Sequence, residues 1–104
     1  MKKTDVIALK KRQDENEKFI LLDVREHYEV ALASIDPHIH IPMAAIPGRH
    51  KELNKKTPIV VMCHTGVRSA QVCHYLQRQG YDATNLEGGI EAWSQVVDPN
   101  VPRY

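Results

Sequence analysis

Two short apolar runs mark the buried strands predicted for this chain. Residues 19–24 read Phe-Ile-Leu-Leu-Asp-Val, and residues 58–62 read Pro-Ile-Val-Val-Met. Continuous rather than alternating apolar residues are typical of strands that are covered on both faces. Pro58 fits as the first residue of such a strand, because no ladder hydrogen bond has to be donated there. A shorter strand is predicted at residues 84–86.

Helical spacing and end signals predict helices between these strands. Thr4 and Asp5 form a cap before the first helix, which fades in the polar run at residues 13–17. The longest helix is predicted over residues 69–79, with Gly80 as its C-terminal cap. Shorter helices are expected at residues 26–33, 47–53 and 88–93. The X-Pro pairs at residues 36–42 and the tail at 98–104 indicate irregular or extended chain.

The alternation of strands and helices predicts the fold class. We expect one α/β domain over residues 1–104, with a mostly parallel β-sheet flanked by helices on both faces. Binding sites in such sheets form outside the carboxyl ends of the strands. Two polar clusters, residues 23–26 and 63–69, follow predicted strands and are therefore the candidate sites.

The near-neutral charge of the chain bears on which partners the protein is expected to bind. Lys and Arg number 14 and Asp and Glu number 13, which leaves a formal net charge of +1. This balance gives no reason to expect nucleic acid or an anionic membrane as a partner. No apolar run reaches membrane-spanning length, and the charges within residues 1–13 are unlike a signal peptide. We therefore expect a cytoplasmic protein whose two cysteines are free.

The strongest candidate chemistry lies in the segment Cys-His-Thr-Gly-Val-Arg-Ser at residues 63–69. Cys63 ends a predicted strand and a helix begins near Ser69, so the N–H groups between them can converge on an anion. Gly66 accepts a positive φ, and Arg68 adds a planar fork of donors suited to an oxyanion. Such a field favours a thiolate, which is the nucleophilic form of cysteine.

A buried structural thiol is the competing interpretation of Cys63. A cysteine at a strand end before a turn commonly serves as a small core residue. Its combination with Gly66, Arg68 and the strand–loop–helix context favours a nucleophile.

Three ordered motifs make the chain resemble the single-domain rhodaneses, the thiosulfate:cyanide sulfurtransferase family. The pattern Cys63-x-x-Gly66-x-Arg68-Ser69 is similar to the active-site loop of that family. Residues 21–26, LLDVRE, resemble its first-strand signature, and residues 86–93, LEGGIEAW, resemble its C-terminal signature. The likeness covers roughly residues 4–95. Residues 33–38 depart from the family's Gly-His-Ile-Pro-Gly-Ala segment.

The resemblance implies an enzyme that relays sulfur, without a metal or an organic cofactor. Cys63 would attack the outer sulfur of a donor such as thiosulfate and keep it as a persulfide. A thiol or cyanide acceptor would then remove that sulfur. Cys63 would be catalytic, and Arg68 would bind the oxyanion of the donor. The substrate-binding loop would comprise His64, Thr65, Gly66, Val67, Arg68 and Ser69.

Two other functions remain as alternatives. Phosphatases and arsenate reductases of the same fold also use a cysteine, a backbone nest and an arginine, typically with five residues between the two side chains. Four residues intervene here, which predicts a narrower cradle. A persulfide carrier or regulatory module would instead serve a protein donor such as a cysteine desulfurase. Intact Cys63 and Arg68 argue against an inactive module.

The remaining polar residues have structural interpretations. Asp23 and Arg25 are expected to support the site by holding loops through hydrogen bonds. Cys73 shares a helix face with Val72 and Leu76, which favours a core thiol over a resolving one. The histidines lack the spacing of a metal site, and surface positions are expected for them: His38, His40 and His50.

Overall fold

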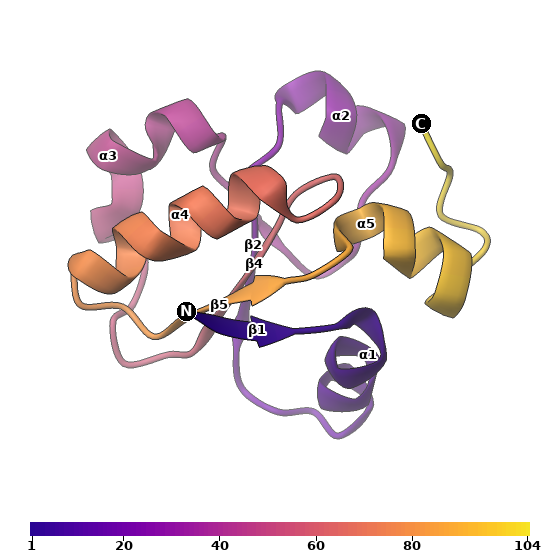
Figure 1. The fold of residues 1–104 in the computed structure, drawn as a ribbon, viewed down its shortest axis with the longest axis horizontal. Helices are drawn as coiled ribbons and strands as arrows, with labels where there is room; N and C mark the ends of the chain where they lie inside the picture. The colour runs from indigo at the N-terminus through magenta and orange to yellow at the C-terminus, as the bar shows by residue number, and fades with distance from the viewer.

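A five-stranded parallel sheet forms the centre of the molecule (Figure 1). The computed structural model describes residues 1–104. The order of the strands across the sheet is β1-β5-β4-β2-β3. The strands are β1 (Lys2–Thr4), β2 (Ile20–Asp23), β3 (Ile39–His40), β4 (Ile59–Met62) and β5 (Ala83–Leu86). The predicted α/β fold with a parallel sheet is confirmed.

Helices cover both faces of this sheet, with α3 and α4 on one side and α1 and α5 on the other (Figure 1). The helices are α1 (Val6–Asp14), α2 (His27–Leu32), α3 (Ile46–Arg49), α4 (Val67–Arg78) and α5 (Gly89–Ala92). Short 3₁₀ turns span Met43–Ala45 and His50–Glu52, and a π-helical turn over Trp93–Val97 follows α5. None of these helices combines the length and the apolar character needed to cross a bilayer.

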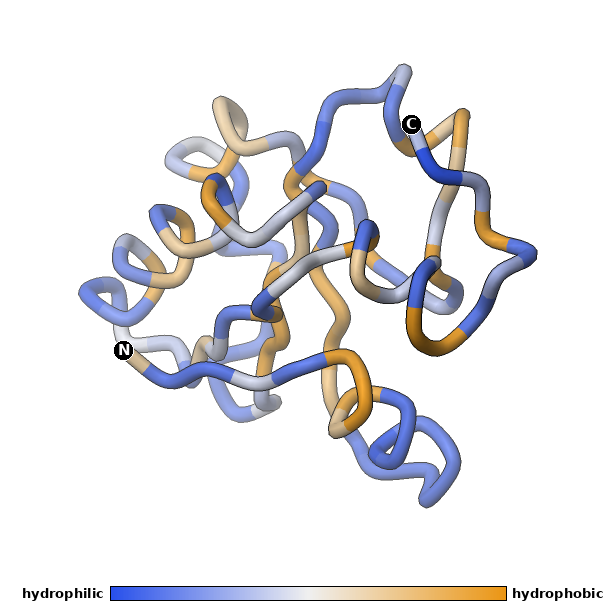
Figure 2. Tube along the Cα trace, turned by 45° about the vertical axis from the view of Figure 1, so that its right-hand side comes forward, coloured by the Kyte–Doolittle hydropathy of each residue, from blue (hydrophilic) through white to orange (hydrophobic).

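The central strand β4 shows why continuous apolar runs were informative. Ile59 and Val61 belong to the core under α3 and α4, whereas Val60 and Met62 belong to the core under α1 and α5. Successive side chains of a strand point to opposite faces, so a strand with two covered faces needs apolar residues at every position. Figure 2 shows this concentration of apolar chain along the inner strands.

Several predicted boundaries were wrong. Helix α4 begins at Val67, two residues before the predicted start, because Gly66 adopts φ 107° and caps it directly. The last helix was expected to stop at Trp93 but continues as the π-helical turn to Val97.

Strand β1 was not predicted, since its three residues, Lys-Lys-Thr, carry no apolar pattern. His50 was expected at the surface, but it is buried and contacts Tyr81.

The topology brings the two candidate clusters together. Strands β2 and β4 are neighbours with parallel register, Asp23 lying beside Met62. The chain after β2 leads outward to β3, whereas the chain after β4 leads to β5 on the opposite side. This reversal makes the carboxyl ends of β2 and β4 the topological switch point of the sheet, the position where open α/β sheets bind ligands.

Candidate active site

Cys63 sits directly after β4, at the centre of a cradle made by its own loop. Its side chain is buried, with 1% of the residue exposed. The backbone N–H of Gly66 points at its sulfur from 3.1 Å and that of Ser69 from 3.3 Å. The thiol in turn donates to the Ser69 hydroxyl oxygen at 3.3 Å. Two backbone donors thus converge on one sulfur atom, which suits a group that becomes negatively charged.

The shape of this loop depends on glycines of two different segments. Gly66 needs its positive φ of 107° to turn the chain from β4 into α4. Gly89, at the start of α5, lies against the back of the loop, and a Cβ there would come within 2.4 Å of the Cys63 and His64 carbonyl oxygens. Those two carbonyls accept hydrogen bonds from the N–H groups of Ile90 and Glu91. The first turn of α5 therefore supports the loop from behind.

Arg68 does not extend freely from the loop but pairs with Glu29 of α2. The guanidinium donates from Nη1 to Glu29 Oε1 at 2.7 Å and from Nη2 to Oε2 at 2.9 Å. The Glu29 side chain is 4% exposed and that of Arg68 is 32% exposed. The hydrogen bonds from Arg68 lower the pKa of Glu29 to about 2. Arg68 keeps N–H groups that this pair does not use, because a guanidinium carries five.

Asp23 and Arg25 form a fully buried pair below α2. Arg25 donates from Nε to Asp23 Oδ1 at 3.0 Å and from Nη2 to Oδ2 at 2.8 Å. Its Nη2 also donates to the Ala33 carbonyl at 2.7 Å, beyond the end of α2. The side chain of Arg25 is therefore enclosed by protein rather than open to a substrate. It ties the end of β2 to the helix that carries Glu29.

The tail reaches this site through Tyr104. Its ring stacks on the imidazole of His64, with centroids 4.1 Å apart and planes inclined by 11°. His64 thus points toward the tail, and its Nε2 atom is buried without a hydrogen-bond partner. Figure 1 shows the chain end beside α2, in agreement with these contacts. The tail is irregular, as predicted, yet its last side chain belongs to the surroundings of Cys63.

The loop residues predicted from the sequence all lie around Cys63, but some contribute backbone N–H groups to its sulfur and others expose side chains to solvent. Gly66 and Ser69 present backbone N–H groups to the sulfur. Thr65 and Val67 have exposed side chains. Cys73 lies on the core-facing side of α4 and is fully buried, as its spacing indicated. No cluster of three or more metal-ligating side chains is present, and His38 and His40 bond to backbone carbonyls.

Three residues of the site carried no sequence signal that we used. Glu29 lies on α2, and its partner Arg68 is 39 residues further along the chain. Asn85 is a polar residue inside a strand, yet it is 3% exposed and links Ser69 to the Gly66 carbonyl. Tyr104 lies in a segment without periodicity. Its contact with Glu29 spans 75 residues of sequence.

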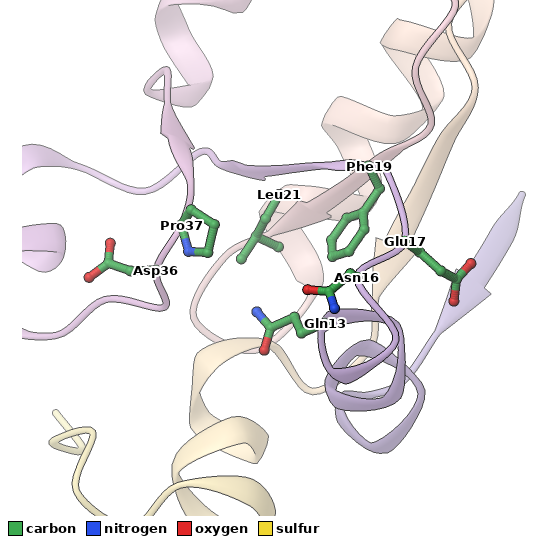
Figure 3. Close-up of a pocket in the computed structure, with 7 residues that line it drawn as sticks. All are labelled: Gln13, Asn16, Glu17, Phe19, Leu21, Asp36 and Pro37. Carbon is green, nitrogen blue, oxygen red and sulfur yellow. The ribbon is translucent and has the colours of Figure 1, made fainter.

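The largest cavity of the molecule lies away from Cys63. It measures about 350 Å³ and is shown in Figure 3. Its lining comes from the end of α1, the start of β2 and the loop before β3: Gln13, Asn16, Glu17, Phe19, Leu21, Asp36 and Pro37. These segments meet at the amino ends of the strands. No cysteine, histidine, lysine or arginine lines this cavity, so the loop at Cys63 remains the candidate active site.

The fold and the loop define an α/β protein that holds a cysteine in a backbone anion cradle beside an arginine. The chain belongs to the Rhodanese-like domain family, whose sequence profile matches residues 5–96. YtwF of Bacillus subtilis (strain 168) is 39% identical over 99 residues, which cover 95% of this chain and 96% of that protein. A protein named Sulfurtransferase from Allochromatium vinosum is 39% identical over 92 residues, which cover 88% of this chain and 86% of the relative.

A solved structure agrees with this assignment. The rhodanese-like domain protein of Staphylococcus aureus superimposes with a TM-score of 0.86 at 39% sequence identity. The match covers 89% of this chain and 91% of that one. The family resemblance predicted from the three motifs is thereby confirmed.

Proposed function

We propose that this chain is a thiosulfate sulfurtransferase that carries sulfane sulfur on Cys63. The observation that carries the proposal is the convergence of the Gly66 and Ser69 N–H groups on the Cys63 sulfur, 3.1 and 3.3 Å away. Membership of a family with relatives named sulfurtransferases supports the same chemistry. We also propose that the protein works in the cytoplasm, where thiols are kept reduced.

The first half of the reaction loads the cysteine. The Cys63 thiolate attacks the outer sulfur of thiosulfate, the sulfur–sulfur bond of the donor breaks, and sulfite leaves with the bonding electron pair. The outer sulfur of the resulting Cys63 persulfide carries the negative charge. The N–H groups of Gly66 and Ser69 stabilise the attacking Cys63 thiolate, and the charge of Arg68 attracts the dianionic donor.

The second half of the reaction regenerates the Cys63 thiolate. An acceptor thiolate or cyanide attacks the outer sulfur of the persulfide, and a new acceptor–sulfur bond forms as the bond to Cys63 breaks. The products are an acceptor persulfide or thiocyanate and the Cys63 thiolate. Division into two displacement steps is the usual benefit of covalent catalysis.

The test is the intact mass of the protein after incubation with thiosulfate and again after cyanide. We expect a gain of one sulfur atom that cyanide removes. Cys63→Ser should gain none, whereas the matched Cys73→Val should gain as much as the wild type. No gain from thiosulfate would overturn the proposal. A gain from a cysteine desulfurase with cysteine would then identify a persulfide carrier, and hydrolysis of an aryl phosphate would identify an oxyanion enzyme.

A further inference from the structure

The Tyr104 hydroxyl links Arg25 to the carboxylate of Glu29, and that carboxylate pairs with Arg68. Its hydroxyl accepts a hydrogen bond from Arg25 Nη1 at 2.8 Å and donates one to Glu29 Oε2 at 2.8 Å. Arg25 is itself fixed, because it is completely buried and bidentate to Asp23. The chain of contacts therefore runs from a rigid cation, through the tyrosine hydroxyl, to the carboxylate that holds Arg68.

The carboxylate of Glu29 has a donor at every position that can accept one. Oε1 accepts from Arg68 Nη1 at 2.7 Å and from the Glu26 N–H at 3.1 Å. Oε2 accepts from Arg68 Nη2 at 2.9 Å and from the Tyr104 hydroxyl at 2.8 Å. A carboxylate offers about four lone-pair sites, so this one is saturated. Its orientation, and with it that of the Arg68 fork, is determined by all four donors together.

We propose that Tyr104 is a positioning residue that acts through Glu29 to hold Arg68 beside Cys63, where its charge selects an anionic sulfur donor. Loss of the Tyr104 hydroxyl removes one of the four donors that orient Glu29 and leaves its negative charge less neutralised. Both changes weaken the attraction of an anion to the loop. The proposal deepens the function proposed above, and its relevance to sulfur donors rests on that function.

Two electrostatic relationships support this role. The pKa of Arg68 is raised, chiefly by its hydrogen bonds to Glu29 and in smaller part by charge at Cys63. Burial is the main reason that the pKa of Tyr104 rises to about 12. The hydroxyl therefore remains a donor to Glu29 throughout the neutral pH range.

The test compares alkylation of Cys63 by iodoacetate and by iodoacetamide, an anion and a neutral molecule of similar size. The ratio of the two rates measures anion selection and needs no sulfur transfer. Arg68→Met should lower the ratio of the iodoacetate rate to the iodoacetamide rate roughly tenfold. This variant is the reference for complete loss of the Arg68 charge. Tyr104→Phe, which keeps the ring over His64, should lower it about threefold with little change in the iodoacetamide rate. Tyr28→Phe is the matched control, since Tyr28 is 68% exposed, and should change neither rate.

A second readout uses thiosulfate itself. Tyr104→Phe should raise KM by a similar factor and leave kcat nearly unchanged, because the donor is recruited less well but reacts at the same thiol. The inference is overturned if the ratio in Tyr104→Phe equals that of the wild type, if both alkylation rates change together, or if Arg68→Met leaves the ratio unchanged. If thiosulfate loads no sulfur but the ratio still falls in Tyr104→Phe, the proposed donor is wrong and the role of Tyr104 stands.

Discussion

The Ser69 hydroxyl donates to Oδ1 of Asn85 at 2.5 Å. The amide group of Asn85 meanwhile donates from Nδ2 to the Gly66 carbonyl at 3.1 Å. Because Nδ2 faces a carbonyl oxygen, Oδ1 must face Ser69, and the orientation of the amide is fixed. The Ser69 oxygen can then accept from the Cys63 thiol. One buried side chain of β5 thus sets the hydrogen-bond directions at both ends of the loop.

Asn85→Asp should slow the loading of Cys63 with little change in shape. The substituted carboxylate still accepts from Ser69, but it offers an acceptor to the Gly66 carbonyl and adds a negative charge beside the sulfur. We expect the rate of sulfur uptake, measured by intact mass, to fall roughly tenfold or more.

Asn54→Asp is the control for this change. Asn54 lies in an exposed turn, where its Oδ1 accepts from the Lys56 N–H. The same substitution there keeps the turn and adds the same charge far from the loop, so the uptake rate should match that of the wild type. Equal rates for both variants would contradict the role assigned to Asn85.

Gly89→Ala should disrupt the loop from behind. Gly89 has φ 56°, and an added Cβ would lie 2.4 Å from two backbone carbonyl oxygens of the loop. Backbone cannot move aside as a flexible side chain can. We expect the free energy of unfolding in urea to fall by about 2–4 kcal/mol, with loss of sulfur uptake. Gly48→Ala has open space around it and should be neutral or slightly stabilising. An unchanged stability of Gly89→Ala would show that α5 does not support the loop.

The parts of the fold that the sequence predicted are those with a local pattern. The runs at β2 and β4 are apolar at successive positions because both faces of the sheet are covered. The loop after β4 was recognisable because its cysteine, glycine and arginine are within six residues of one another. Edge strand β1 has only polar residues that pair with β5, and nothing local distinguishes it from irregular chain.

The supporting residues could not be predicted, since their roles depend on distant partners. Glu29 lies 39 residues from Arg68, and Tyr104 lies 79 residues from Arg25. Such contacts follow from the folded topology rather than from spacing. The stacking of the Tyr104 ring on His64 is a further contact of this kind.

Cys73 should be inert in the native protein. It is fully buried, and this burial is the main reason that its pKa rises to about 12. At pH 8 only roughly one molecule in ten thousand carries a thiolate there. We expect iodoacetamide to label one site in the wild type and none in Cys63→Ser until the protein is unfolded. Labelling of native Cys63→Ser would instead show that Cys73 is accessible and revive its role as a resolving thiol.

Glu29 should make the stability of the protein depend on acid. Its pKa falls from an ordinary value of 4.5 to about 2, chiefly because Arg68 donates to it. A lowered carboxyl pKa adds stability that is complete above about pH 5 and is lost as the pH falls toward 2. Glu29→Gln should therefore reduce the free energy of unfolding by about 2–3 kcal/mol at pH 7, and the gap to the wild type should narrow between pH 5 and pH 2.

Glu52→Gln, which breaks a similar but exposed pair with Arg49, should show almost no gap at any pH. A gap for Glu29→Gln that stays constant across this range, measured by urea unfolding at each pH, would mean that packing rather than charge gives Glu29 its effect.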